Sequence, residues 1–411
     1  MTHKVAVTGL GALTPLGLDV QSSWDAILAG KSGIGEITCM DASAFAVQIA
    51  GEVKGFDPKS VIAPKEVNKI DRYAHLAIAA SEEAVKDSGL TADMYGAKRI
   101  GVVIGTGVGG LNTVEENFTK YMEKGPRRIS PFVVPKMMCN AASGLVSIRH
   151  GFKGPNFAVV TACASANHSI GEASRLIKYG FADAVVTGGA EAAITVLGLG
   201  GFCSAKALST FKGSPTEACR PFDESRDGFV LAEGAGVVVL ENLEKAKARG
   251  AKIYAVLDGY GASGDAYHIT APIEDGSGGA EAMREALDEA EWNYEDVDYI
   301  NAHGTSTPRG DVVETKVIKA VFGEHAKNLS VSSTKSSTGH TLGAAGGIEA
   351  VLSIKALQNG VMPGTLNHHT PDAECDLDYV PLVPREKNLK KVLSNSLGFG
   401  GHNSVLAFSS L

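Results

Sequence analysis

A cysteine in the segment TACAS, residues 161–165, has the most chemically suggestive setting in the chain. It stands where an apolar run ends and a helical pattern begins. The free N–H groups and the positive end of that helix dipole would favour a thiolate and lower the pKa of the Cys163 thiol. The N–H of Cys163 would point into the same space and help to bind an oxyanion. We therefore expect a nucleophile here, whereas a buried structural cysteine is the commoner fate of this residue type.

Two further segments supply two histidines and a lysine. His303 follows a short apolar run in NAHGTSTP, and Lys335 and His340 lie five residues apart in STKSSTGH. A cysteine peptidase needs one histidine and an orienting Asn or Asp, so this set exceeds that requirement. Two neutral imidazoles can donate hydrogen bonds to one thioester carbonyl and stabilise an enolate. Together with Cys163, these residues predict a Cys–His–His acyl-transfer site.

A fourth segment, NSLGFGGHN at 395–403, places Phe399 among glycines. Such a loop either moves or presents backbone N–H groups, and a plain hairpin turn is the alternative. The other five cysteines have no comparable setting and are expected to be structural thiols. Since no two cysteines form a C-x-x-C pair, zinc ribbons and thioredoxin-type redox sites are excluded.

The elements that must hold these segments can be read from the apolar pattern. Short apolar runs ending in small residues predict buried strands at 4–10, 100–107, 157–163, 184–189, 237–240, 253–260, 299–304 and 392–397. Helical patterns lie at 164–179, 281–290, 312–321 and 342–358, and three of them stop before a glycine. This alternation predicts a layered α/β fold with largely parallel strands. The basic segment at 245–252 is the best candidate for a domain boundary. We therefore expect two loosely similar halves, 1–250 and 251–411.

Composition sets outer limits on function. The chain has 411 residues, 44% hydrophobic and 20% charged, which suits a packed core. The net charge of −8 argues against nucleic-acid binding. No apolar stretch reaches about 18 residues, so no membrane span is expected. The N-terminus lacks the apolar core of a signal peptide, and we expect a cytoplasmic protein with reduced thiols.

Taken together, the motifs resemble those of the β-ketoacyl-acyl carrier protein synthases, elongating condensing enzymes of the thiolase fold. The resemblance rests on TACAS, NAHGTSTPRGD, STKSSTGHTLGAAG and NSLGFGGHN, with RPFDESRDGFV at 220–230, and it spans nearly the whole chain. Among the subtypes, the chain most resembles the type II synthases of bacterial fatty acid synthesis. The resemblance implies two pseudo-equivalent halves in a five-layered αβαβα arrangement, a homodimer, and no metal or organic cofactor.

The resemblance also implies roles for individual residues. Cys163 would carry the acyl chain as a thioester, while His303 and His340 would activate malonyl-acyl carrier protein for decarboxylation. Lys335 would support the site electrostatically with Glu349 as its partner, and the N–H groups of Cys163 and Phe399 would form the oxyanion hole. Phe399 would also gate the site. The implied acyl pocket comprises Val108, Phe202 and Leu342, and the implied malonyl and pantetheine contacts are Thr270, Thr305 and Thr307.

A carrier protein of this family is acidic, and the chain itself is acidic. A local basic patch would therefore have to guide the two proteins together. The residues that match the carrier-binding side of the family are Lys65, Lys69, Arg127, Arg128 and Lys206. Ordinary solvated surface is the alternative for each of them.

Three other functions fit parts of this pattern. A polyketide ketosynthase shares every motif, and a free-standing chain of this length slightly favours fatty acid synthesis. A non-catalytic partner subunit on the same fold would lack the nucleophile, whereas Cys163, His303, Lys335 and His340 are all present. Thiolases and priming synthases use Cys–His–Cys and Cys–His–Asn sets instead.

Overall fold

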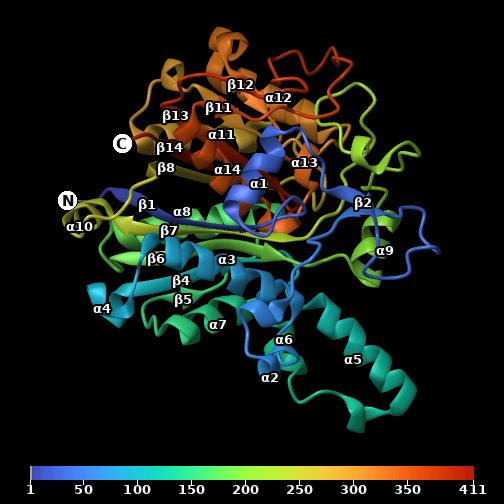
Figure 1. The fold of residues 1–411 in the computed structure, drawn as a ribbon. Helices are drawn as coiled ribbons and strands as arrows, with labels where there is room; N and C mark the ends of the chain where they lie inside the picture. Colours follow the sequence, from blue (N-terminus) through green and yellow to red (C-terminus); the bar gives the residue numbers. More distant parts are fainter. Residues whose placement is uncertain (1) are drawn as a thin grey trace.

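The computed structural model describes residues 2–411, and its centre is a ten-stranded sheet made of two five-stranded halves (Figure 1). The first half has the strand order β5-β4-β6-β7-β1 and the second has β10-β9-β13-β14-β8. The first half consists of β1 (Val5–Leu13), β4 (Ile100–Gly105), β5 (Asn156–Phe157), β6 (Ala184–Glu191) and β7 (Gly234–Asn242). The second consists of β8 (Ala255–Gly264), β9 (Tyr299–Asn301), β10 (Ser330–Ser332), β13 (Lys391–Gly398) and β14 (His402–Ser409).

The two halves repeat one topology. In the first, β5, β4 and β6 run parallel, and β7 and β1 then continue antiparallel. In the second, β10, β9 and β13 run parallel, followed by antiparallel β14 and β8. A short antiparallel pairing of β1 with β8, at Val5 to Val7, joins the halves. The predicted resemblance between the halves is therefore a repeated fold, with β6 equivalent to β13 and β4 to β9.

Helices complete five layers around these sheets. α3 (Arg72–Ser88) and α7 (Ala141–His150) cover the outer face of the first half, and α11 (Ser277–Ala290) and α12 (Gly310–Phe322) cover that of the second. α8 (Ser165–Lys178) and α14 (Ala345–Asn359) lie between the halves, where they share the largest apolar core. This αβαβα order is the predicted architecture, visible in Figure 1.

Most predicted elements are present because the apolar pattern reflects real burial. Every residue of β4, β6 and β7 is buried, as continuous apolar runs predict. α12 and α14 end directly before Gly323 and Gly360, and α8 ends two residues before Gly180; all three glycines have positive φ angles. The predicted strand at 157–163 is largely wrong. Only Asn156–Phe157 pair, because β5 is the outer strand of the sheet and has a single neighbour.

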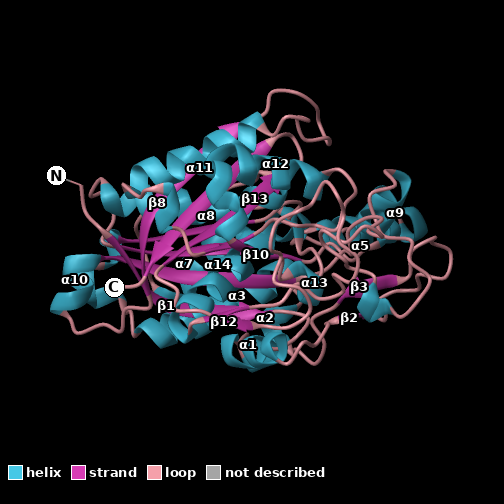
Figure 2. Cartoon of the chain, turned by 90° about the horizontal axis from the view of Figure 1, so that it is seen from above, coloured by secondary structure: helices cyan, strands magenta, loops and turns pink. Residues whose placement is uncertain are grey.

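Several segments extend beyond the repeated halves. α5 (Leu111–Lys124) projects away from the layers, with the short α6 (Val133–Met137) beside it (Figure 1). Both termini lie at one end of the molecule, and loops gather at the opposite end (Figure 2). No helix within residues 2–411 is long and apolar enough to cross a membrane. The remaining elements are α1 (Val20–Leu28), α2 (Pro64–Val67), α4 (Ala92–Tyr95), α9 (Val196–Ser204), α10 (Leu243–Ala248), α13 (Lys335–Thr338), β2 (Ile34–Glu36), β3 (Ile49–Gly51), β11 (Val361–Met362) and β12 (Arg385–Glu386).

Candidate active site

Cys163 sits on a sharp turn between extended chain and helix α8. Ala162 has a φ of 50°, a conformation that L-residues rarely adopt, and the 3-10 turn Ala162–Ala164 then leads into the helix. The Ser165 hydroxyl fixes the turn by donating to the Ala162 carbonyl and accepting the Thr161 N–H. The turn presents the thiol at the helix N-terminus, where it is 7% exposed.

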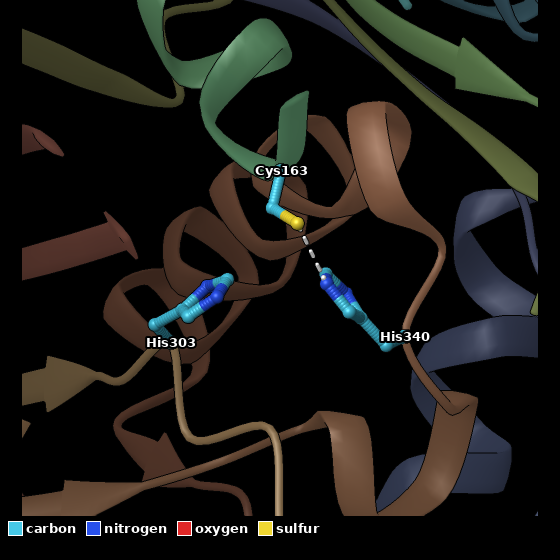
Figure 3. Close-up of side chains that lie close together, drawn as sticks. All are labelled: Cys163, His303 and His340. Carbon is cyan, nitrogen blue, oxygen red and sulfur yellow. Dashed lines mark hydrogen bonds between the residues drawn. The ribbon is translucent and has the colours of Figure 1, made fainter. Parts of the chain in front are cut away.

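The two predicted histidines approach this thiol from the second half of the chain (Figure 3). His303 follows β9, and His340 lies between α13 and the turn that begins α14. The Nε2 atom of His340 lies 3.0 Å from the Cys163 Sγ, and the two imidazole rings are 5.4 Å apart and nearly perpendicular. Three segments that are remote in sequence thus meet at one point.

Both imidazoles are held in the neutral form. Burial is the main cause that lowers their pKa values well below the ordinary histidine value, since it disfavours the charged ring. The positive charge of Lys335 lowers both pKa values further. A neutral imidazole whose N–H faces the cavity can donate a hydrogen bond to a carbonyl oxygen and so stabilise an enolate.

The thiol of Cys163 behaves differently from the sequence-based expectation. Burial raises its pKa to about 11, and the helix N-terminus does not produce the predicted net lowering. The backbone N–H of Phe399 and the charge of Lys335 do lower this pKa, but burial outweighs them. The resting nucleophile is therefore a neutral thiol that must give up its proton during attack.

Lys335 stands behind the site and not within it. Its side chain is 1% exposed and forms a buried ion pair with Glu349 on α14. Burial raises the pKa of Glu349, and the lysine charge opposes that shift. The pair holds a positive charge close to both imidazoles without exposing it to the cavity.

One cavity of about 740 Å³ opens onto Cys163, His303 and His340. Phe202 packs edge-on against Phe229, which packs edge-on against His340 and so connects the cavity wall to the site. The structure brings every residue of the predicted pocket to this cavity: Val108, Phe202, Thr270, Thr305, Thr307, Leu342 and Phe399 all line it.

Phe399 lies in the turn between β13 and β14, beside the Cys163 turn. A Cβ atom added to Gly398 would come within 2.9 Å of the Thr161 carbonyl oxygen and 3.3 Å of the Cys163 nitrogen. A side chain at position 398 would therefore force the two turns apart. Because it has none, the N–H groups of Cys163 and Phe399 both approach the sulfur.

A residue missed by the sequence interpretation holds His303 in place. Glu314 on α12 is 1% exposed and accepts the backbone N–H groups of His303 and Gly304 at 2.8 and 2.7 Å. It also accepts the Asn395 side-chain amide at 3.1 Å. The available signal was an acidic residue between Val313 and Thr315, in the helical pattern directly after the histidine loop.

The Cys–His–His cluster also resembles a metal-binding set, because one ligand atom from each residue lies within 4.8 Å of the others. A histidine that binds a metal normally donates its second ring N–H to an acceptor. Within residues 2–411, the Nδ1 atoms of His303 and His340 are both buried without a hydrogen-bond partner. The surroundings therefore do not fit a metal centre, and a substrate carbonyl suits the cluster better.

The predicted basic residues are spread over several elements. Lys206, with a φ of 53°, lies at the cavity wall after α9. Lys65 is exposed on α2, and Lys69 forms an ion pair with Glu66 at 3.1 Å and lies over the Phe132 ring. Arg127 and Arg128 are exposed in the turn that follows α5. Only Lys206 reaches the cavity itself.

A thiolase-like fold with a buried cysteine and two neutral histidines at one cavity defines the class of condensing acyltransferases. This chain belongs to the beta-ketoacyl synthase family. The N-terminal domain of that family matches residues 2–246, and its C-terminal domain matches residues 254–369.

Individual relatives place the chain within this family. It is 52% identical over 405 residues to 3-oxoacyl-[acyl-carrier-protein] synthase 2 of Staphylococcus aureus (strain COL), covering 98% of each chain. The protein of the same name from Synechocystis sp. is also 52% identical, over 98% of this chain and 97% of its own.

Solved structures give the same fold at lower identity. A beta-ketoacyl synthase from Burkholderia phymatum superposes with a TM-score of 0.92 at 34% identity. A type II polyketide ketosynthase, solved with its acyl-carrier protein and bound to a hexaketide, has a TM-score of 0.93 at 34% identity. Both matches cover the full length of each chain.

Proposed function

We propose that this protein is a 3-oxoacyl-acyl carrier protein synthase of fatty acid elongation. It transfers an acyl chain to Cys163, decarboxylates malonyl-acyl carrier protein, and joins the two to give 3-oxoacyl-acyl carrier protein and CO2. The observation that carries this proposal is the contact of a buried thiol with one neutral imidazole, 3.0 Å away, beside a second neutral imidazole facing the same cavity.

In the first step, the Cys163 sulfur attacks the acyl thioester of the carrier. The thiol proton passes to the departing pantetheine sulfur, and the Nε2–H of His340, 3.0 Å from the Cys163 sulfur, stabilises the developing thiolate by donating to it. The N–H groups of Cys163 and Phe399 stabilise the negative oxygen of the tetrahedral intermediate. The bond from the acyl carbon to the pantetheine sulfur breaks, and the acyl group remains on Cys163.

In the second step, the malonyl thioester loses CO2. Its carbonyl oxygen accepts hydrogen bonds from the imidazoles of His303 and His340, which stabilise the enolate left by the departing carboxylate. The enolate carbon then attacks the acyl carbon on Cys163, the acyl–sulfur bond breaks, and the Cys163 thiolate that leaves takes up a proton from water to restore the thiol. The positive Lys335 nearby favours the negative charge of the enolate, and it adds to burial in lowering the pKa values of both imidazoles.

A polyketide ketosynthase is the second candidate, because a ketosynthase of that type shares the fold at 34% identity. The higher identity of 52% to synthases named for 3-oxoacyl-acyl carrier protein supports fatty acid elongation. A non-catalytic partner subunit is disfavoured because Cys163 is present and lies in hydrogen-bond contact with His340.

The homodimer is part of this proposal. β5 is an edge strand, and an exposed strand edge invites pairing with a second chain. Exposed apolar side chains gather on and next to it, including Ile148 (80% exposed), Val160 (49%) and Phe157 (38%). We expect two copies to pair through β5 about a two-fold axis. Ile148→Glu combined with Val160→Asp should give a monomer in light scattering, and an unchanged dimer mass would place the interface elsewhere.

Carrier binding, domain division and location complete the proposal. The basic residues on α2, after α5 and after α9 would steer an acidic carrier toward the cavity. The domain boundary lies near residue 250, and α10 between β7 and β8 supports that division. A cytoplasmic location stays a prediction.

Mass spectrometry of the acyl-enzyme tests the proposed function directly. Purified protein is mixed with acyl-acyl carrier proteins of increasing chain length, and the mass added to the Cys163 peptide is measured. We expect one acyl group per chain on Cys163, discharged to 3-oxoacyl product when malonyl-acyl carrier protein is added. Acylation of another residue, or an acyl group that malonyl carrier never discharges, would contradict the proposal.

A further inference from the structure

A buried carboxylate that the reaction described above does not use lies at the end of β6. Glu191 is 0% exposed, and its partners are hydroxyl and backbone donors with no cation among them. It accepts the Thr106 hydroxyl at 2.8 Å, the Gly107 N–H at 2.6 Å, the Gly343 N–H at 3.1 Å and the Val108 N–H at 3.3 Å. Burial raises its pKa, and these donors oppose that shift.

This carboxylate joins two loops from different halves of the chain. Residues 106–108 follow β4, whereas Gly343 belongs to the turn that begins α14. A Cβ added to Gly343 would lie 2.2 Å from the Gly107 nitrogen and 2.8 Å from Glu191 Oε2. A Cβ added to Gly107 would lie 2.7 Å from the same oxygen. The two backbones are therefore in direct contact around the carboxylate, at a distance that only glycine permits.

Each joined loop carries a side chain of the cavity wall. Val108 directly follows Gly107, and Leu342 directly precedes Gly343. Both line the cavity beside Cys163, and Leu342 is packed in the same apolar cluster as Cys163. The Glu191 carboxylate therefore ties together the backbones on which these two side chains stand.

The repeated topology shows what position this carboxylate occupies. Glu191 is the last residue of β6, and Gly398 is the last residue of the equivalent strand β13. The first turn, which leads into α8, carries Cys163, and the second turn, which leads into α14, carries Gly343 at the equivalent position. At the first turn, the N–H groups of Cys163 and Phe399 face the cavity. At the second turn, the N–H of Gly343 is occupied by the Glu191 carboxylate.

We propose that Glu191 is a positioning residue that holds Val108 and Leu342 at a fixed separation, and thereby sets which acyl chain lengths load onto Cys163. This inference rests on the proposed function, since it requires Cys163 to accept acyl chains. Loss of the carboxylate would let the two loops separate, because an amide in its place points a donor at backbone donors. Hydrophobic pockets discriminate acyl chains through such small changes in wall position.

The test is the loading rate of Cys163 as a function of acyl chain length in Glu191→Gln. We expect the ratio of loading rates for twelve-carbon and four-carbon acyl carriers to change by roughly tenfold. Alkylation of Cys163 by iodoacetamide, which needs the thiol and not the acyl pocket, should not slow. A folded Glu191→Gln protein with the wild-type ratio would overturn the inference.

Two further variants keep the test decisive. Thr106→Val removes one of the four donors with little change of shape, and should shift the same ratio in the same direction by a smaller factor. If Glu191→Gln does not fold, an unchanged ratio in Thr106→Val overturns the inference. The matched control is Glu241→Gln, an equally buried glutamate on β7 bound to Thr8, Tyr95 and Arg249, where the ratio should stay unchanged.

These measurements also separate the two levels of inference. Failure of wild-type protein to load any acyl chain on Cys163 would overturn the proposed function. Normal loading with an unaltered chain-length ratio in both pocket variants would overturn only the role of Glu191.

Discussion

The central helices α8 and α14 are each preceded by a 3-10 turn of the same backbone conformation, yet the two turns have different functions. Ala162 and Leu342 have nearly the same left-handed φ, 50° and 47°, and each begins a 3-10 turn. The N–H of Ala164 donates to the Thr161 carbonyl at 3.0 Å, and that of Ala344 to the Thr341 carbonyl at the same distance. The backbone has therefore kept one geometry through the repeat.

The second residue of each turn determines the function of that turn. The first turn carries Cys163, whose sulfur reaches His340 in the cavity. The second carries Gly343, whose N–H is bound by a buried carboxylate and whose backbone packs directly against the loop after β4. One turn is left free for a substrate oxygen, while its counterpart is filled from within the protein. A duplicated helix N-terminus thus becomes catalytic only where its N–H donors stay unoccupied.

Replacing the nucleophile at the first turn should have the largest effect on activity. In Cys163→Ala, condensation should fall by at least about a thousandfold, because no thioester can form. Decarboxylation of malonyl carrier should persist, since His303 and His340 remain. The melting temperature should stay within a few degrees of wild type. Condensation near the wild-type rate in this variant would disprove the mechanism.

Removing His303 tests whether the second half supplies the decarboxylation chemistry. His303→Ala should lower malonyl decarboxylation by roughly 100- to 1,000-fold, as expected for the loss of one donor to a developing oxyanion. Acyl loading of Cys163 should change far less, because His340 is the residue in contact with the thiol. His75→Gln, a buried histidine on α3 away from the cavity, is the control. A loss confined to acyl loading would reverse these roles.

A substitution in the second turn should lower the stability of the fold, whereas a substitution of Cys163 in the first turn should abolish the chemistry. Gly343→Ala places a Cβ 2.2 Å from the Gly107 nitrogen, and we expect it to lower the free energy of unfolding by about 3 kcal/mol. Urea denaturation measures this loss. The control is Gly201→Ala in α9, where an added Cβ meets nothing within 4 Å and should be neutral or slightly stabilising. Equal stability of the two variants would mean that the backbone contact is easily relaxed.

The sequence predicts the layers of the fold well, but it predicts the pKa values and contacts of buried charged groups poorly. Strands such as β4 and β6 were predictable because apolar residues on both faces signal burial. The short β5 was overestimated, since pattern alone cannot show that a strand has one neighbour. The cavity residues Phe202 and Leu342 were reachable only through motif resemblance, because their spacing carries no chemistry.

Electrostatic effects depend on contacts that the sequence does not display. The position of Cys163 at a helix N-terminus predicts a lowered pKa, but burial raises that pKa to about 11. Glu191 and Glu314 were missed for a related reason. Each carboxylate holds backbone N–H groups of a loop that motif spacing does not connect to it.

The buried ion pair should control the acidic limit of activity. His303 and His340 act as neutral rings, and both their pKa values lie below the ordinary value of 6.5, partly because of Lys335. Removing that positive charge raises both pKa values, so the rings become protonated at a higher pH. The double variant Lys335→Met with Glu349→Gln avoids leaving one buried charge unpaired.

As the pH falls, the double variant should lose decarboxylation of malonyl-pantetheine at a higher pH than the wild-type protein does. A pH–rate profile for both proteins measures the shift, which we expect to be about one pH unit. Arg249→Met with Glu241→Gln, a second largely buried ion pair remote from the cavity, should leave the limit unchanged. An unchanged acidic limit in the first variant would mean that burial alone keeps the rings neutral.

The smallest effect should come from the basic residues outside the repeated fold. Lys65→Glu with Lys69→Glu should raise the apparent KM for carrier-bound substrate several-fold, and less at high salt, because exposed charges act at long range and are screened. Turnover of malonyl-pantetheine should not change.

Lys65 should contribute more than Lys69, since the Lys69 charge is already paired with Glu66 at 3.1 Å. Lys247→Glu is a matched control, because Lys247 forms a similar exposed pair with Glu244 three residues away on α10. If Lys247→Glu raises the KM as much as Lys69→Glu does, the net charge of the protein and not a local patch at α2 governs carrier binding.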